Sequence, residues 1–256
     1  SADSILSFIT YAHNNWQTPP DYVLLLGDAS YDPKNFSGMG NTNLVPTKII
    51  ETLYEETGSD EALADFNHDG LSDLAIGRIP AKTPQDVTNA LAKVMAFETP
   101  AMQDLDRGAI FAYDLPIGWN FEASSRSLGD LLPASVPKIY IGRGDTNSAT
   151  TLINEINLGR YIVNYSGHGS TGVWAASSFF GVNSVPQLTN ANRLSLFTML
   201  TCLNGYFVSP YADSLAEKLH NAQNGGSVMS WASTGKTTPD IQMIMATRFY
   251  EQLALG

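Results

Sequence analysis

The chain contains very little cysteine and few basic side chains. Cys202 is the single cysteine among 256 residues, so no intrachain disulfide can form. The 14 Lys and Arg residues face 25 Asp and Glu residues, for a formal net charge of −11. This acidic balance argues against a broad basic face that would bind nucleic acid or an anionic membrane.

Long apolar runs are also missing. No run approaches the roughly 18 to 20 residues that a membrane-spanning helix needs, which predicts no membrane insertion. The opening residues, SADSILSF, lack a basic segment followed by an apolar one. Because the chain also begins without methionine, we expect a mature form or an excised domain, with any targeting segment outside it.

Several motifs of well-known chemistry are absent as well. The sequence has no glycine-rich phosphate loop, no CxxC pair and no HExxH motif, so nothing points to nucleotide binding, dithiol redox chemistry or zinc hydrolysis. Its length is nevertheless sufficient for one large or two smaller α/β domains with a proper core.

Short apolar runs bounded by Gly, Asp and Pro alternate with amphipathic segments along the chain. This alternation is typical of a mostly parallel sheet with helices on both faces, and we predict a three-layer α/β sandwich. The expected strands are DYVLLLGDAS, LSDLAIGR, GAIFAYD, KIYIG, YIVNYSG, LSLFTMLTC and GSVMSWAS, and the expected helices cover residues 5–12, 84–97, 122–132, 149–158, 213–222 and 240–253.

Residues 98–108, ETPAMQDLDRG, are the most linker-like segment. We therefore predict two subdomains, an N-terminal α/β subdomain over residues 1–100 and a C-terminal α/β subdomain over residues 101–256, which contains His168 and Cys202.

Four predicted strands end in residues that carry chemistry: Asp28, Asp114, His168 and Cys202. In parallel sheets, ligand groups collect beyond the carboxyl ends of the strands. If the strands before His168 and Cys202 are neighbours, both side chains emerge at one edge, as a thiolate nucleophile and its proton shuttle require. Taken singly, the cysteine also fits a small buried residue and the histidine a turn, but their joint position favours catalysis. Asp28 is expected to be structural or a second cation ligand.

Glycines flank the histidine on both sides, at Gly167 and Gly169. Without a Cβ atom, the backbone can bend sharply and approach a substrate closely. An oxyanion on a scissile carbonyl needs two N–H donors, and we assign these to Gly169 and Cys202.

The stretches NYSGHGSTGVW, PQLTNANRLSLFTMLTCLNGYF, ADSLAEKLHNAQNGGSV and SWAST resemble the catalytic domain of the gingipains, the C25 family of cysteine peptidases. The resemblance is strong from Arg160 to Thr234 and extends more weakly towards the N-terminus. It implies a caspase-like fold, with Cys202 as nucleophile and His168 as general base and acid. A carboxylate at an earlier strand end orients the histidine in this family, and Asp114 occupies the corresponding position.

The same resemblance suggests a pocket that accepts a basic side chain before the cut, through an acidic residue. Glu122 and Asp240 lie in the two regions where family members carry that acid, and a carboxylate there would form a charge-assisted contact with Arg. Glu122 also fits a simple helix start, and Lys236 in GKTTPD could instead favour an acidic side chain. Trp174 is expected in the cleft wall, among the substrate-binding residues.

The segment DFNHDGLSD is a candidate calcium loop. Side-chain oxygens recur at Asp65, Asn67, Asp69 and Asp73, and Gly70 allows a sharp turn. The Leu71 carbonyl would add a ligand, but the twelfth position is Ile76 rather than Glu, so the loop is no standard EF-hand. It looks like the calcium loops of extracellular modules, which predicts structural Ca²⁺ and a secreted or bacterial cell-surface protein.

Three functions remain open at this point. The first is a secreted cysteine endopeptidase acting on protein or peptide substrates through an acyl-enzyme. The second is a sortase-like transpeptidase of the same family, in which an amine replaces water. The third is a calcium-dependent binding module without catalysis.

Overall fold

The chain folds into two compact units in the computed structural model, which describes residues 1–40, 42–175 and 179–255. The first unit comprises residues 1–88 and 206–213, and the second comprises residues 89–205 and 214–256. The division falls inside helix α2 (Pro84–Phe97), ahead of the predicted linker. The part of α2 from residue 89 onward belongs to the second unit, in which the Lys93 ammonium contacts backbone carbonyls. No described helix is long and apolar enough to cross a membrane.

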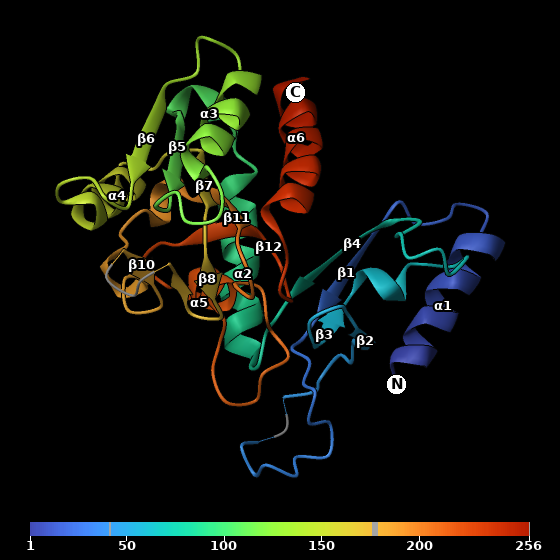
Figure 1. The fold of residues 1–256 in the computed structure, drawn as a ribbon. Helices are drawn as coiled ribbons and strands as arrows, with labels where there is room; N and C mark the ends of the chain where they lie inside the picture. The colour runs from blue at the N-terminus through green and yellow to red at the C-terminus, as the bar shows by residue number, and fades with distance from the viewer. Residues whose placement is uncertain (41, 176–178, 256) are drawn as a thin grey trace. The chain divides into compact units, whose positions relative to one another are not determined.

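A five-stranded, fully parallel sheet forms the centre of the second unit (Figure 1). Its strand order is β12-β11-β7-β5-β6. The strands are β5 (Ala109–Tyr113), β6 (Lys138–Gly142), β7 (Ile162–Ser166), β11 (Ser195–Leu200) and β12 (Ser227–Ala232). Each is short and rich in apolar residues, as a strand buried on both faces requires.

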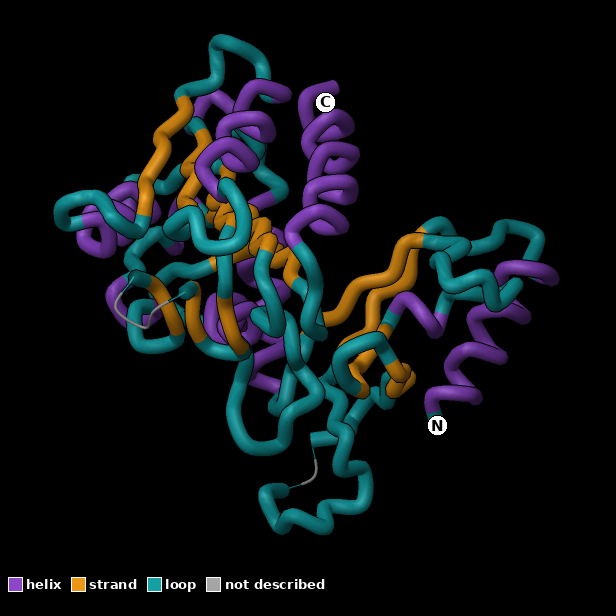
Figure 2. Tube along the Cα trace, viewed as in Figure 1, coloured by secondary structure: helices purple, strands orange, loops and turns teal. Residues whose placement is uncertain are grey.

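Helices cover both faces of this sheet, because alternate residues of each strand point to opposite sides. Helices α3 (Phe121–Leu131) and α6 (Pro239–Leu255) pack over one face. Helices α4 (Ser148–Asn157) and α5 (Leu215–Asn221) pack over the other. The three layers are visible as purple and orange tubes in Figure 2, and the second unit has the predicted α/β architecture.

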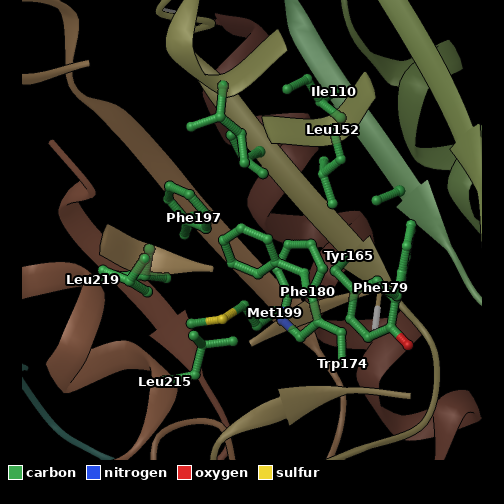
Figure 3. Close-up of a cluster of buried hydrophobic side chains, with 14 of the residues drawn as sticks. Ile110, Leu152, Tyr165, Trp174, Phe179, Phe180, Phe197, Met199, Leu215 and Leu219 are labelled. Carbon is green, nitrogen blue, oxygen red and sulfur yellow. The ribbon is translucent and has the colours of Figure 1, made fainter. Parts of the chain in front are cut away.

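A small antiparallel meander follows β7 and was not predicted. It consists of β8 (Gly169–Ser170), β9 (Val173–Trp174) and β10 (Phe180–Gly181). Its aromatic side chains join the core on the α4 and α5 side, where Trp174 stacks on Tyr165 with ring centroids 4.4 Å apart (Figure 3). The strands are too short to produce a periodic signal in the sequence.

The first unit is built around two smaller sheets. Strands β1 (Tyr22–Leu26) and β4 (Ala75–Ile79) pair in parallel, and β2 (Lys48–Glu51) and β3 (Glu56–Ser59) form a hairpin. Helix α1 (Ala2–Asn15) completes the unit, and its Ile9 packs with Leu25 and Leu63 in a separate apolar core.

Candidate active site

His168 and Cys202 follow two neighbouring strands. β7 and β11 pair in parallel, and the last matched residues are Ser166 and Leu200. Because each candidate residue lies two positions further along, the register brings His168 and Cys202 to the same level at the carboxyl edge of the sheet. This is the edge where ligand groups gather in parallel sheets.

The imidazole of His168 is oriented by a backbone carbonyl. Its Nε2 lies 2.9 Å from the oxygen of Ile117, and the ring is exposed. A carbonyl can only accept a hydrogen bond, so Nε2 carries the proton and Nδ1 of the neutral ring is left as the basic nitrogen. The edge-to-face contact with Phe121, at 5.2 Å between centroids, further restrains the ring.

Asp114 lies beside His168 but contacts its backbone. The carboxylate accepts hydrogen bonds from Arg143 Nε at 2.6 Å, from the N–H of Leu115 at 2.7 Å and from the N–H of His168 at 3.3 Å. Asp114 is buried, so the guanidinium supplies the charge compensation that a buried carboxylate needs. Asp114 therefore lies beside the histidine, but it contacts the histidine backbone, and the imidazole ring is hydrogen-bonded to Ile117 instead.

Sequence reasoning missed both Arg143 and Ile117. Arg143 directly follows β6. The β5–β6 register pairs Tyr113 with Gly142, so Asp114 and Arg143 occupy the next matched positions beyond the two strands. Knowledge of the strand order would have revealed this pair. The Ile117 carbonyl gave no signal, because every residue carries one.

Cys202 lies in a tightly held loop and is partly buried. Its thiol is 3.5 Å from the carbonyl oxygen of Thr237. Among the described residues, no hydrogen bond joins the thiol to the imidazole. The preceding carbonyl, of Thr201, accepts from Gln242 Nε2 of α6 at 3.1 Å. The next residue, Leu203, has a φ of 62°, a left-handed conformation that strains a bulky side chain and is typical of functional loops.

The glycines around His168 are required by close packing. A Cβ on Gly167 would lie 2.3 Å from the Tyr165 hydroxyl, and one on Gly169 would lie 2.4 Å from Thr201 Oγ1. The N–H of Ala175 donates to the oxygen of His168, which makes the neighbouring Gly169–Trp174 pair the non-hydrogen-bonded kind in the β8–β9 ladder. The Gly169 amide is thus directed away from β9, as an oxyanion donor would be.

A small pocket lies between the starts of α3 and α6 and the ends of β7 and β11. All of its lining side chains are uncharged: Trp119, Phe121, Ser124, Ser166, Leu200, Pro239, Gln242 and Met243. Phe121 also touches the His168 ring, so the pocket adjoins the predicted catalytic residues.

The two predicted specificity acids flank this pocket without lining it. Glu122 follows Phe121 in the first turn of α3 and pairs with Arg126 at 2.8 Å. Asp240 follows Pro239 in the first turn of α6. A hydrogen bond with the Thr238 side chain, aided by the Ile241 N–H, holds the pKa of Asp240 below its usual value. Both carboxylates are exposed.

Trp174 is a correction to the sequence-based assignment. The ring is fully buried among Tyr165, Phe179 and Phe180, as Figure 3 shows. Trp174 pairs with Gly169, next to the histidine, but its side chain lies within the core and cannot contact a substrate.

The predicted calcium loop lies in the first unit and is tightly curled. Both oxygens of Asp65 accept backbone N–H bonds, from Asp69 at 3.1 Å and Gly70 at 3.0 Å. Asn67, Asp69 and Asp73 each accept one such bond as well. Across the described ranges, no three His, Cys, Asp or Glu side chains are gathered as a metal site.

Asp28 is a buried member of an ion-pair group in the first unit. Lys82 Nζ lies 3.6 Å from its carboxylate and also pairs with Asp213. Its environment agrees with the structural alternative, since the lysine provides the compensating charge.

The chain is similar in sequence to gingipains. Gingipain R2 and gingipain R1 of Porphyromonas gingivalis are each 37% identical to the chain over 248 residues, or 91% of it. The chain spans 31% of the length of the first and 23% of the second.

Solved structures show the same fold. The crystal structure of the Arg specific cysteine proteinase gingipain R matches with a TM-score of 0.82 and 24% identity, over 100% of this chain and 58% of that one. The complex of Porphyromonas gingivalis RgpB pro- and mature domains matches at 0.83 and 24%, over 99% and 59%. The predicted fold class is confirmed.

A model of peptidase family C25 matches residues 1–255, so every helix and strand described above lies within the match. The chain belongs to peptidase family C25.

Proposed function

We propose that this chain is the catalytic part of a secreted or cell-surface cysteine endopeptidase in which Cys202 and His168 act together. The observation that carries the proposal is the parallel pairing of β7 with β11, whose register sets the two residues level at one sheet edge. Membership of family C25 supports the same reaction, and protein or peptide chains are its substrates. The proposal includes secretion because the related proteins are gingipains.

The reaction follows from the tautomer of His168. Nδ1 takes the thiol proton, and the thiolate attacks the scissile carbonyl carbon to form a C–S bond. The N–H groups of Gly169 and Cys202 stabilise the oxyanion. The imidazolium returns its proton to the leaving amine as the C–N bond breaks. Water, deprotonated by Nδ1, then attacks the thioester and releases Cys202 and the acid product.

Alkylation tests the dyad directly, because the chain has a single cysteine. We expect iodoacetamide to label Cys202 rapidly at neutral pH, and His168→Ala to slow labelling by about tenfold or more, since the thiolate would lose its proton acceptor. His68→Ala, in the calcium-loop candidate, is the matched control and should leave the rate unchanged. Cys202→Ala should abolish peptide hydrolysis.

Retained hydrolysis by Cys202→Ala would refute the endopeptidase assignment. Amide products formed from added amines would assign the transpeptidase instead. If Cys202 reacted like an ordinary thiol and no peptide were cleaved, the chain would be a non-catalytic module.

The proposal extends to cleavage after a basic residue. Glu122 and Asp240 each adjoin a residue that lines the pocket, and a solved relative is described as Arg specific. Peptides with Arg before the cut should be cleaved about tenfold or more faster than peptides with norleucine, and Glu122→Gln or Asp240→Asn should reduce that ratio. Glu251→Gln, which also removes a partly exposed carboxylate paired with an arginine, should not. Equal rates with Arg and norleucine would contradict a basic preference.

Structural calcium in the Asp65–Asp73 loop completes the proposal. The donor set of carboxylate, amide and carbonyl oxygens suits Ca²⁺, although in the structure these carboxylates accept hydrogen bonds from the loop backbone. Millimolar Ca²⁺ should raise the melting temperature, and Asp65→Asn with Asp69→Asn should remove that rise. The control is Asp32→Asn, which changes another partly exposed loop carboxylate that accepts backbone N–H bonds. An equal melting temperature with Ca²⁺ and with chelator would exclude the site.

A further inference from the structure

Two polar side chains interrupt the apolar centre of the sheet. Asn164 lies in the middle of β7 and Thr198 lies in β11, and both are fully buried. They are matched partners in the β7–β11 register. The row that they belong to is otherwise aromatic, with Tyr140, Phe111 and Trp231 at its flanking positions.

Tyr250 of α6 contacts this pair from the face of the sheet that α3 and α6 cover. Thr198 Oγ1 donates to Asn164 Oδ1 at 2.9 Å. The Tyr250 hydroxyl lies 2.9 Å from Thr198 Oγ1 and donates to Asn164 Oδ1 at 3.2 Å. The amide of Asn164 in turn donates to Ser166 Oγ at 3.1 Å, at the end of β7 and two residues before His168.

Burial of three polar side chains is costly unless their hydrogen bonds are made. Here the bonds are made only in one register of β7 against β11. A slip by one residue would turn every side chain of the strand to the other face. A slip by two residues would keep the faces but move His168 by about 6.6 Å relative to Cys202 and separate the polar partners. Aliphatic partners would distinguish these registers far less, because apolar contacts are non-directional.

We infer that Asn164, Thr198 and Tyr250 are positioning residues, which fix the register of the two central strands and so keep His168 level with Cys202. The inference rests on the proposed function, in which this pair carries the chemistry. None of the three touches the reacting atoms. They act through β7 and β11, with Ser166 as the link nearest to the histidine.

The test compares variants that remove one hydroxyl at nearly constant volume, Thr198→Val and Tyr250→Phe. The readout is the pH dependence of Cys202 alkylation by iodoacetamide, which needs no substrate. We expect the midpoint to rise by about one pH unit in each variant, corresponding to about tenfold slower labelling below the midpoint. On a cleaved peptide, kcat should fall by a similar factor while KM is unchanged.

Ionisation of Tyr250 cannot itself shift the midpoint of Cys202 alkylation. Burial raises the pKa of its hydroxyl, which therefore keeps its proton throughout the pH range of the alkylation experiment. Tyr140→Phe is the matched control, since the rings of Tyr140 and Tyr250 both contact Phe111. Thr198→Ser keeps the hydroxyl and loses a buried methyl group. It should therefore lower the melting temperature yet keep the alkylation profile of the unchanged protein.

An unchanged profile in folded Thr198→Val and Tyr250→Phe would overturn the positioning role and leave the proposed function intact. Equal shifts in Thr198→Ser and Thr198→Val would also overturn it, because loss of packing alone would then explain the effect. If alkylation of the unchanged protein did not depend on His168, the proposed function would fail, and the positioning role would fail with it. Urea unfolding of every variant confirms that folded protein is being compared.

Discussion

At the scale of single residues, charge compensation of Asp114 is the critical feature of the histidine loop. The carboxylate is buried, and Arg143 is its ionic partner. Removal of one member of such a pair leaves an uncompensated charge, so we expect Arg143→Met to lower the free energy of unfolding by about 3 kcal/mol. Because Asp114 also holds the N–H of His168, alkylation of Cys202 should slow as well.

Arg126→Met provides the control, since it breaks the exposed i,i+4 pair with Glu122. Its cost should be much smaller than that of Arg143→Met, as exposed pairs contribute little. Urea denaturation of both variants measures the difference. Equal losses would contradict a special role for Arg143.

At the scale of secondary-structure elements, the carbonyl groups at the C-terminal end of α5 are capped by Lys93, a side chain of α2, rather than by a glycine. Lys93 Nζ donates to the carbonyls of His220 at 2.6 Å, Gly225 at 2.9 Å and Leu219 at 3.2 Å. A cation suits the negative end of a helix dipole. Burial nevertheless lowers the pKa of Lys93 to about 8, because the charged form has left water.

This pKa predicts a particular pH dependence of stability. The folded-state pKa of about 8 lies below the ordinary 10.5, so between these values the unfolded chain binds more protons. Stability from this group therefore rises with pH through that window, by about 3 kcal/mol in total. Urea unfolding between pH 7.5 and pH 10.5, a window chosen around these values, should show the rise.

Lys93→Met should lose both the pH-dependent rise and the helix cap. Lys218→Met, which removes an exposed lysine from α5 itself, should keep the rise. If the stability of the unchanged protein did not change across this pH window, burial would not lower the pKa of Lys93, and the prediction would be wrong.

At the scale of the whole molecule, each of the two units has its own core and its own buried ion pair. In the first unit, Arg78 binds Asp60 through two bonds of 2.8 Å, and Thr47 donates to the same carboxylate at 2.7 Å. The Arg78 guanidinium also lies 4.9 Å from the Phe207 ring centroid. Residues 206–213 are thereby joined to the first unit.

We therefore expect Arg78→Met to destabilise the first unit by about 3 kcal/mol. Calorimetry should show a transition at lower temperature, while Cys202 alkylation in the second unit keeps its rate. Arg143→Met should produce the opposite combination. A slowed alkylation in Arg78→Met would indicate that the units do not unfold independently.

The sequence by itself determined the order of most helices and strands, because their periodicity and flanking Gly, Asp and Pro residues are local signals. It also placed His168 and Cys202 at strand ends. It did not predict the β2–β3 hairpin, whose strands KIIE and ETGS are only four residues long and too short to give a clear alternating pattern.

Only the tertiary structure decided which groups surround the two candidate residues. The Ile117 carbonyl has no sequence signature, Arg143 meets Asp114 through strand order, and Trp174 is in the core because a short meander turns it inward. The polar pair Asn164 and Thr198 likewise becomes meaningful only when β7 lies beside β11. Contacts between distant segments depend on strand order and register, which the local pattern of residues does not encode.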